Sequence, residues 1–477
     1  MQTYQDAYTV SSLMSHQEAR SIILAFAFGG ALGDAVGKGV AYSHLSTDKI
    51  TTTWIAGIQD FELDQPINRY LIIIDRTSRK VMSHSPITIP RFECEECIFA
   101  ATGHHVRALA RSADGALSIS YRVSIVEDDA VEYLIQLRFF ADVTSMNLLM
   151  TFAAANTAPA VLPIPQVYMI PGELERQAKS HFGRQITRFI CGRMAGSLLP
   201  MMPHAARLAF VRNMAKAYEA IWDLPIPRSP RLIGELRATS SDSTDSQTIA
   251  LHIGPDRQYG FAGPLTSVRD HLCAFIRFHL TAFEAQDGID PYKSRYLSRV
   301  KAFVEAGMYN IPKVVESIPI VAQHCDLAPH NVILKATDAN SPMASEIAAV
   351  IDWEFVAAAP FMSAHRSIEM LFREFAQNDF GPEFHRAGEL RHAFWDAIPK
   401  WKAWYEHEAT VVYLEWYRFA LFLKPAEPDD GIDEEELWNV FWAENVRVTE
   451  CMLRKYGGGE LEKTFFIGAC NASDRNC

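Results

Sequence analysis

The chain has 477 residues, of which 49% are hydrophobic and 21% are charged, and its net charge is −12. This balance is typical of a globular protein with two or three domains and excludes an intrinsically disordered chain. The acidic surplus argues against generic nucleic-acid binding, because no excess of basic residues is present to contact phosphates.

The cysteines and the N-terminal residues indicate a cytoplasmic protein. Eight cysteines are scattered through the chain without a dense framework, which favours reduced thiols. The first twenty residues are polar and contain Asp6 and Glu18, so they do not have the pattern of a secretory signal. The apolar stretch from Ser21 to Gly33 is too short to span a membrane, and we expect no membrane association.

A candidate metal site is the segment Cys94-Glu-Glu-Cys97, followed by His104 and His105. It lacks the second properly spaced ligand pair of a zinc site, and adjacent imidazoles rarely both reach one ion. We therefore expect Cys94 and Cys97 to be reduced thiols on the solvent side rather than zinc ligands.

The chain from residue 106 to residue 138 is predicted to form antiparallel strands. Largely alternating apolar and polar side chains cover Val106–Arg111, Leu117–Val126 and Tyr133–Arg138. Polar turn sequences at 112–115 and 127–130 separate these runs.

The second half of the chain is predicted to be mainly helical. Helical patterns cover His204–Ile221, Ser267–Phe283 and most of the sequence after residue 352. The polar tract Thr239–Ser246 between the first two helices is expected to be a surface loop.

Residues 321–354 are the most informative segment. Two apolar runs, Asn331–Leu334 and Ile347–Ile351, flank a turn-rich stretch and predict a β-hairpin. Such a hairpin brings Asp326 and Asp352, which are distant in sequence, to the same end. With the amide of Asn331 they then form an oxygen-rich cluster. A kinase needs such groups: a carboxylate that accepts the proton of the attacking group, and oxygen ligands for Mg²⁺.

The motif His324-Cys-Asp326-Leu-Ala-Pro-His-Asn331, followed by Ile351-Asp352-Trp-Glu, has the spacing of a kinase catalytic loop. It resembles most closely the aminoglycoside phosphotransferase and choline kinase-like family, of the type common in filamentous fungi. The resemblance implies that Asp326 is the catalytic base, that His324 braces the catalytic loop, and that Asn331 and Asp352 are metal ligands. It also implies ATP and Mg²⁺ as cofactors.

A looser resemblance to the same family covers residues 106–450 and suggests the nucleotide site. Gly115 and Ser118 lie in the segment that resembles the family's nucleotide loop, with Ser118 where asparagine is usual. Gln136 aligns with the phosphate-binding Lys or Arg of the third strand. Arg138 lies on the same face of that strand and would supply the charge if the register is shifted. Met146 stands where the next helix usually offers a glutamate.

Two further residues are assigned to the nucleotide through the resemblance. Main-chain groups near Phe189 and Ile190, at the segment that connects the two lobes, are expected to contact the adenine. The alternative is that both residues belong only to the hydrophobic core.

The resemblance implies an α+β fold of the protein-kinase-like bilobal type, with a small antiparallel-β N-lobe and a larger, mainly helical C-lobe. The expected units are an N-terminal extension at 1–100, the N-lobe at 101–190, the C-lobe with the catalytic loop at 191–455, and a flexible tail at 456–477.

The function expected from this resemblance is ATP- and Mg²⁺-dependent phosphorylation of a hydroxyl or amine group of a small-molecule metabolite, without nucleic-acid or membrane partners. The alternative is a catalytically impaired pseudokinase that binds a nucleotide or a protein partner. Gln136 and Met146 favour this alternative, whereas the intact Asp326, Asn331 and Asp352 oppose it. The acceptor, the oligomeric state and the role of residues 1–100 do not follow from the sequence.

Overall fold

The computed structural model describes residues 89–457 except 113–117, 139–141, 181, 244–245, 257–258, 262, 336–344, 376–379 and 429–430. Before residue 89 it describes four short strands, which pair as two hairpins: β1 (Ser43–Ser46) with β2 (Lys49–Thr52), and β3 (Ile72–Ile74) with β4 (Val81–Ser83). The predicted flexible tail from residue 458 onward and Gly115 lie outside the described residues.

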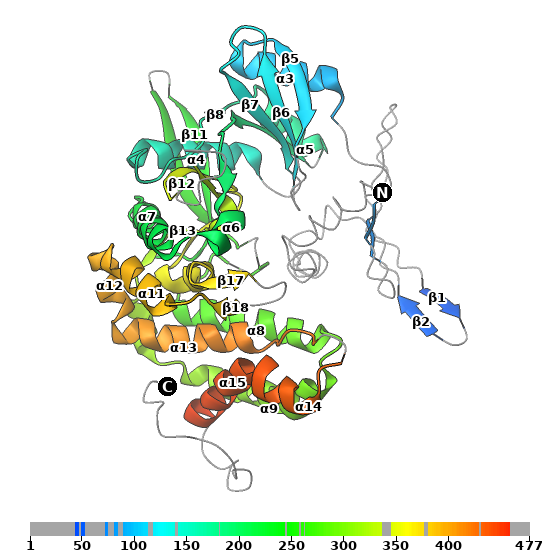
Figure 1. Ribbon diagram of the computed structural model, residues 1–477, viewed down its shortest axis with the longest axis vertical. Coiled ribbons are helices and arrows are strands. Elements are labelled where there is room, and N and C mark those ends of the chain that lie inside the picture. Colours follow the sequence, from blue (N-terminus) through cyan, green and yellow to red (C-terminus); the bar gives the residue numbers. More distant parts are fainter. Residues whose placement is uncertain are drawn as a thin grey trace.

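The N-lobe is a five-stranded antiparallel sheet, at the top of Figure 1, with the strand order β5-β6-β7-β9-β8. Its strands are β5 (Val106–Arg111), β6 (Ser118–Ile125), β7 (Glu132–Arg138), β9 (Gly183–Arg188) and β8 (Val167–Tyr168). Its helices are α3 (Arg91–Thr102), α4 (Val143–Asn156) and α5 (Glu173–Ser180). The strands predicted between residues 106 and 138 are therefore confirmed.

The two faces of β7 have different roles because successive side chains of a strand point to opposite faces. Tyr133, Ile135 and Leu137 enter the hydrophobic core that the sheet shares with α3. Gln136 and Arg138 consequently point to the other face, toward α4 and the C-lobe. This alternation determines which residues of the third strand are available to a site between the lobes.

Cys94 and Cys97 correct one prediction. Both are free thiols, as expected, but they are only 0% and 4% exposed and pack into the core beneath the sheet. Residues three apart on a helix share one face, and in α3 that face is the buried one. Burial raises the pKa of the Cys94 and Cys97 thiols to about 12 and about 11. In the described part of the chain, no group of three or more His, Cys, Asp or Glu side chains is arranged to hold a metal.

The C-lobe is mainly helical and lies below the sheet in Figure 1. Its longer helices are α7 (His204–Trp222), α8 (Val268–Ala285), α9 (Asp290–Gly307), α11 (Ala387–Asp396), α12 (Pro399–Tyr405), α13 (Glu408–Phe422) and α15 (Ala443–Tyr456). Helix α13 packs against both α8 and α15. No helix among the described residues is long and apolar enough to cross a bilayer. The expected α+β fold, with a small antiparallel-β N-lobe and a larger, mainly helical C-lobe, is confirmed.

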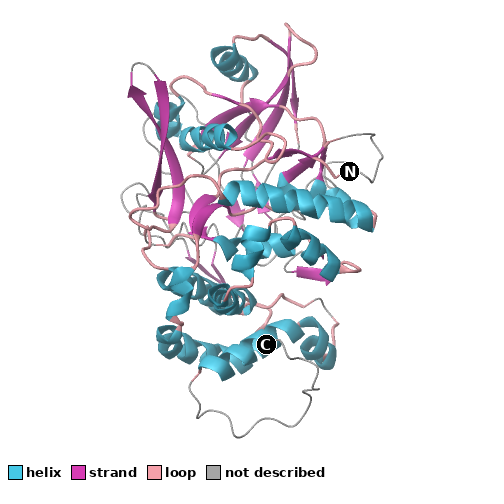
Figure 2. Ribbon diagram, turned by 90° about the vertical axis from the view of Figure 1, so that its left-hand side faces the viewer, coloured by secondary structure: helices cyan, strands magenta, loops and turns pink. Residues whose placement is uncertain are grey.

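The prediction of a surface loop at Thr239–Ser246 is wrong. This tract lies in a long hairpin formed by β11 (Gly234–Ser243) and β12 (Ser246–Gly254), with Thr239 opposite Ala250. Figure 2 shows the hairpin as two long strands beside α4. Serine and threonine occupy a strand here because the partner strand supplies the pairing, and strand preference depends strongly on such context.

The hairpin belongs to a four-stranded sheet that connects the C-lobe to helix α4 of the N-lobe. The strand order is β12-β11-β16-β13, where β16 is Val356–Pro360 and β13 is Ile320–His324. Beyond its pairing with β16, β11 runs along α4, and the buried main-chain N–H of Ala238 donates to Ser145 Oγ at 2.9 Å.

Removing the Ser145 hydroxyl is expected to lower the free energy of unfolding by about 1–3 kcal/mol, because it leaves the buried N–H of Ala238 without an acceptor. Chemical denaturation of Ser145→Ala checks this value. The matched control is Ser317→Ala, which removes an exposed hydroxyl that donates to Val314 O, so its stability should stay within about 0.5 kcal/mol of the parent. Equal losses in the two variants would contradict the role of Ser145.

Candidate functional site

The predicted β-hairpin is present and brings two distant loops together. Strands β14 (Val332–Leu334) and β15 (Ile347–Val350) pair antiparallel, with Val332 opposite Val350. The loop that follows β13 lies beside the segment that follows β15: Cys325 N donates to Phe355 O at 2.8 Å, and Ile351 N donates to Asn331 O at 3.0 Å. This pairing places Asp326 and Asp352 at one edge of the C-lobe sheets.

Asp326 is held by two neighbours in its own loop. Asn331 Nδ2 donates to the main-chain oxygen of Asp326 at 2.8 Å and to its Oδ2 at 2.9 Å, and His330 Nε2 lies 3.1 Å from the same Oδ2. Burial opposes ionisation of Asp326, but the charge and the hydrogen bond of His330 outweigh it, and the pKa of Asp326 is lowered. Asp326 is therefore an oriented carboxylate at neutral pH. Asn331 uses its nitrogen in these bonds, which leaves its Oδ1 as a potential ligand.

His324 lies beneath the two loops. It is 1% exposed, its Nε2 lies 3.0 Å from Ile351 O, and its ring meets the edge of the buried Trp353. Burial lowers the pKa of His324, which keeps the ring neutral and lets Nε2–H donate to the Ile351 carbonyl. A neutral imidazole that connects β13 to the residue before Asp352 fits the expected bracing role.

The cation of the third strand is Arg138, not a residue at position 136. The Arg138 side chain is 4% exposed and bonds to Asp352 Oδ1 at 2.6 Å and to Glu354 Oε2 at 2.9 Å. Its third and fourth bonds go to Gln185 Oε1 at 2.8 Å and Gln136 Oε1 at 3.1 Å. The neutral Gln136 therefore positions the charged group instead of replacing it.

The link from this cation to helix α4 runs through two amides. Gln185 accepts from Arg138 with its oxygen and donates from Nε2 to Asn147 Oδ1 at 2.8 Å. Met146, where a glutamate is usual, is 5% exposed and packs in the core. The neighbouring Asn147 reaches Arg138 only indirectly, through Gln185.

The network around Arg138 contains one more negative than positive charge when both carboxylates are ionised. Glu354 is 5% exposed, and burial together with the charge of Asp352 raises its pKa, against the opposing effect of Arg138. Asp352 is 35% exposed and has φ = 67°, a left-handed conformation that aspartate tolerates better than most residues. A divalent cation beside the exposed oxygen of Asp352 would neutralise the surplus charge.

Of the remaining predicted nucleotide residues, Ser118 lies beside this network, whereas Phe189 lies at the opposite end of β7. Ser118 lies opposite Arg138 in the β6–β7 pairing and is 8% exposed. Phe189 N donates to Glu132 O at 3.0 Å, which occupies its main-chain donor. The main-chain groups of Ile190 make no hydrogen bond with another described residue, so Ile190 is the better candidate for contact with a base.

Sequence reasoning assigned no role to Glu354, Gln185 and Asn147. Glu354 follows Asp352 at a spacing of two, but the segment forms a turn, so this spacing alone does not predict that both carboxylates contact Arg138. Gln185 carried a weak signal, since it is a polar residue within a strand whose neighbours are buried. Nothing in the sequence connects Asn147 to Gln185, because their contact depends on how α4 crosses the sheet.

No family model and no curated protein sequence matches the chain. The chain is similar to the solved structure of APH(2'')-IIa with streptomycin and ATP, at 13% identity over 76% of this chain and 97% of that chain (TM-score 0.41). It is also similar to the ADP-bound aminoglycoside phosphotransferase APH(2'')-Ib, at 13% identity over 76% of this chain and 97% of that chain (TM-score 0.40).

A third similar structure is an aminoglycoside phosphotransferase from Alicyclobacillus acidocaldarius, at 14% identity over 80% of this chain and 98% of that chain (TM-score 0.38). Likenesses at these identities and scores carry no argument about activity. The chain is therefore similar over most of its length to solved aminoglycoside phosphotransferases, and its function has to be inferred from the site itself.

Proposed function

We propose that the protein is a phosphotransferase of the aminoglycoside phosphotransferase and choline kinase-like family, which uses ATP and Mg²⁺ to phosphorylate a hydroxyl or amine group of a small molecule. The observation that carries the proposal is a single network across both lobes. On one side Asp326 is an ionised carboxylate held by Asn331, and on the other Asp352 is bonded to Arg138.

The residues present fit a Mg²⁺–nucleotide complex. Mg²⁺ prefers oxygen ligands and commonly takes only one or two from the protein, with phosphate and water oxygens for the rest. Asn331 Oδ1 and the exposed carboxylate oxygen of Asp352 are suitable ligands, and Arg138 brings a positive charge to the phosphates. Bound Mg²⁺ would lower the electrostatic cost of placing a polyphosphate beside Asp326 and Asp352.

Asp326 would act on the acceptor. Its carboxylate orients the attacking hydroxyl or amine and takes the proton as the new bond to the γ-phosphorus forms and the bond to the β–γ bridging oxygen breaks, which releases ADP. Asn331 and His330 keep the carboxylate in place during this step. His324 stays neutral and maintains the spacing of the two loops.

The second candidate function is a pseudokinase that binds a nucleotide or a partner without transfer. One observation favours it: Arg138 is already engaged with two carboxylates, so a nucleotide has to compete with Asp352 and Glu354 for the guanidinium. Met146 also favours the pseudokinase, because helix α4 has no carboxylate that could hold the Arg138 guanidinium when the nucleotide binds.

We also propose the division of the chain into an extension at 1–100, an N-lobe at 101–190 and a C-lobe at 191–455. Helix α3, Arg91–Thr102, crosses the first boundary and packs onto the N-lobe sheet. The free cysteines among the described residues are in keeping with a cytoplasmic protein, which we propose as its location.

A thermal-shift titration separates these functions at the binding step. A ligand that binds only the folded state stabilises it by about 2.7 kcal/mol at one hundred times its dissociation constant. We expect ATP with Mg²⁺ to raise the midpoint temperature of unfolding of wild type. In Asp352→Asn, the part of this rise that depends on Mg²⁺ should be lost. The control is Asp287→Asn, an exposed aspartate outside the site, which should keep the full shift.

The outcomes of this titration distinguish the two candidate functions and test the metal role of Asp352. No rise at any ATP concentration would overturn the phosphotransferase proposal. A rise that persists in Asp352→Asn would remove the metal role of that residue. A Mg²⁺-dependent rise justifies a screen of small hydroxyl- and amine-bearing acceptors with labelled ATP, and failure of every acceptor class would favour the pseudokinase.

A further inference from the structure

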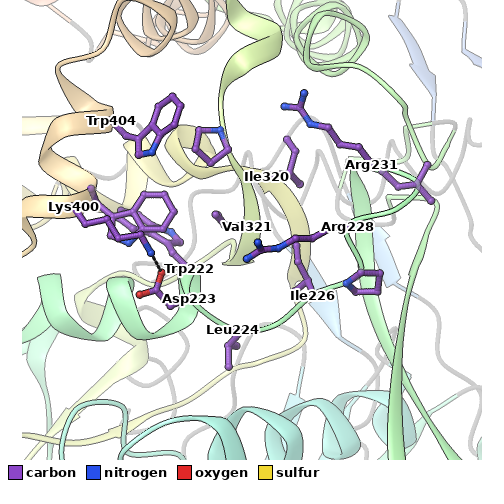
Figure 3. A pocket seen from close by; sticks show the side chains of 14 residues that line it. Trp222, Asp223, Leu224, Ile226, Arg228, Arg231, Ile320, Val321, Lys400 and Trp404 are labelled. Atoms are coloured by element: carbon purple, nitrogen blue, oxygen red, sulfur yellow. Dashed lines mark hydrogen bonds and ion pairs between the residues drawn. The ribbon is translucent and has the colours of Figure 1, made fainter.

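A cavity lies in the C-lobe, and the residues of the network described above do not line it. It has a volume of about 380 Å³ and is formed by the end of α7 and the loop after it, the first residues of β13, and α12 (Figure 3). None of the residues placed in the phosphotransfer site lines it. Strand β13 connects the two places, with Ile320 and Val321 at the cavity and His324 about 10 Å further along, at about 3.3 Å per residue.

Aromatic rings make up much of the cavity wall. Trp222 and Trp401 are each 3% exposed and meet edge to face, with ring centroids 5.0 Å apart. Trp404 lines the same cavity on the next turn of α12 and is only partly buried. Flat indole surfaces of this kind favour a planar or apolar ligand, because they bury large apolar area at fixed geometry.

The polar groups of the cavity that lack partners are hydrogen-bond donors. Trp401 Nε1 is buried and has no acceptor among the described residues. Arg228 is exposed and makes no hydrogen bond or ion pair with a described residue, and in Figure 3 its guanidinium extends toward the side of Trp222 and Lys400. A ligand in the cavity can reach the Arg228 guanidinium but not the fully buried Trp401 Nε1, and to satisfy Arg228 it must bring an acceptor oxygen.

The charges of the lining point to an anion. Lys400 Nζ is paired with Asp223 Oδ1 at 2.5 Å, and the Arg231 guanidinium donates to the carbonyls of Glu316 and Ile318. Arg228 remains without a compensating carboxylate. The lining thus carries a positive surplus in a chain whose net charge is −12.

We propose that this cavity binds a small planar carboxylate, with its ring against the partly exposed Trp404 and its carboxylate facing Arg228. None of the residues assigned to the nucleotide, to Mg²⁺ or to proton transfer lines the cavity. It is also connected to the catalytic loop, because Trp222 Nε1 donates to Gln323 Oε1 at 3.1 Å and Gln323 precedes His324. The proposal does not depend on phosphotransferase activity.

The test uses 1-naphthoate as the probe and 1-naphthamide, its uncharged counterpart, as the ligand control. Isothermal titration calorimetry on the full chain should show saturable 1:1 binding of naphthoate and at least about ten-fold weaker binding of the amide. Arg228→Gln should weaken naphthoate binding about ten-fold, which corresponds to the loss of one charged contact. Trp404→Ala, at a partly buried position, should weaken both ligands.

Two control variants keep the result interpretable. Arg212→Gln changes an exposed arginine of α7 outside the cavity and should bind naphthoate as wild type does. Asp326→Asn should also bind it unchanged, which separates this cavity from the phosphotransfer site. The absence of naphthoate binding up to millimolar concentration would overturn the proposal. Binding that is equal in wild type and Arg228→Gln, or that is lost in Asp326→Asn, would do the same.

Discussion

Asp326→Asn is expected to lower the rate of phosphoryl transfer by about 10²–10⁴-fold, the range typical of a lost general base. The amide keeps the shape of the carboxylate and can still accept a hydrogen bond from Asn331, so the fold and nucleotide binding should persist. The measurement is the initial rate with saturating ATP and an acceptor found by screening, combined with the thermal shift produced by ATP and Mg²⁺.

The comparison with Asp287→Asn makes this prediction specific. Both substitutions remove one negative charge, but Asp287 is exposed and lies outside the site, so its variant should keep the wild-type rate. A rate loss of less than about three-fold in Asp326→Asn would show that Asp326 is not the base. A lost thermal shift in the same variant would mean that the substitution damaged binding rather than proton transfer.

Arg138→Met is expected to lower the free energy of unfolding by about 3–5 kcal/mol above about pH 8, where Glu354 is ionised in wild type, and to abolish the shift caused by ATP. Removing one partner of a buried ion pair leaves the remaining charge uncompensated, which accounts for a loss of this size. Here Glu354, at 5% exposure, would lose its cation. Chemical denaturation measures the loss, and Arg212→Met, at an exposed arginine, is the matched control.

The pH dependence of Arg138→Met follows from the sign of the Glu354 shift. The pKa of Glu354 in the folded state lies above its ordinary value because of burial and the nearby Asp352, and loss of Arg138 raises it further. A carboxyl with a raised folded-state pKa favours the folded state when protonated, and this contribution disappears as the pH rises through that pKa. Relative to wild type, the variant should therefore lose more stability above about pH 8, where Glu354 is ionised in wild type but still protonated in the variant, than at pH 6.

A second variant tests the assigned cause. In Arg138→Met/Glu354→Gln the buried carboxylate is replaced by a neutral amide, so part of the lost stability should return and its dependence on pH should weaken. Two results would contradict this assignment. One is a loss in the free energy of unfolding of less than about 1 kcal/mol for Arg138→Met at pH 8, and the other is a double variant that is no more stable than the single one. Either would show that Arg138 does not compensate the charge of Glu354.

The parts of this protein that followed from the sequence are those set by local pattern. Alternating side chains predicted the strands of the N-lobe, and two apolar runs around a polar turn predicted the hairpin that joins Asp326 to Asp352. The close spacing of Asp326 and Asn331 places them in one loop, where their contact depends on few other residues. These features need only short stretches of chain and the turn between them.

The parts that did not follow depend on how distant elements pack. The sequence does not tell which side of α3 is covered, so Cys94 and Cys97 were expected on the wrong side. The tract Thr239–Ser246 is polar enough for a loop and becomes a strand through its partner. Likewise, the amides of Gln185 and Asn147 form a relay to Arg138 only because β9 and α4 approach the same face of β7.

The β11–β12 hairpin has a consequence for motion between the lobes. It continues a sheet that includes β13 and β16, yet its outer part is attached to α4 through Ser145. A strand pair that is anchored at both ends behaves as a stiff brace, which bends far less readily than a single connecting chain. A rotation of the N-lobe against the C-lobe must therefore either flex this brace or release Ala238 from Ser145, which limits the angle through which the lobes can swing.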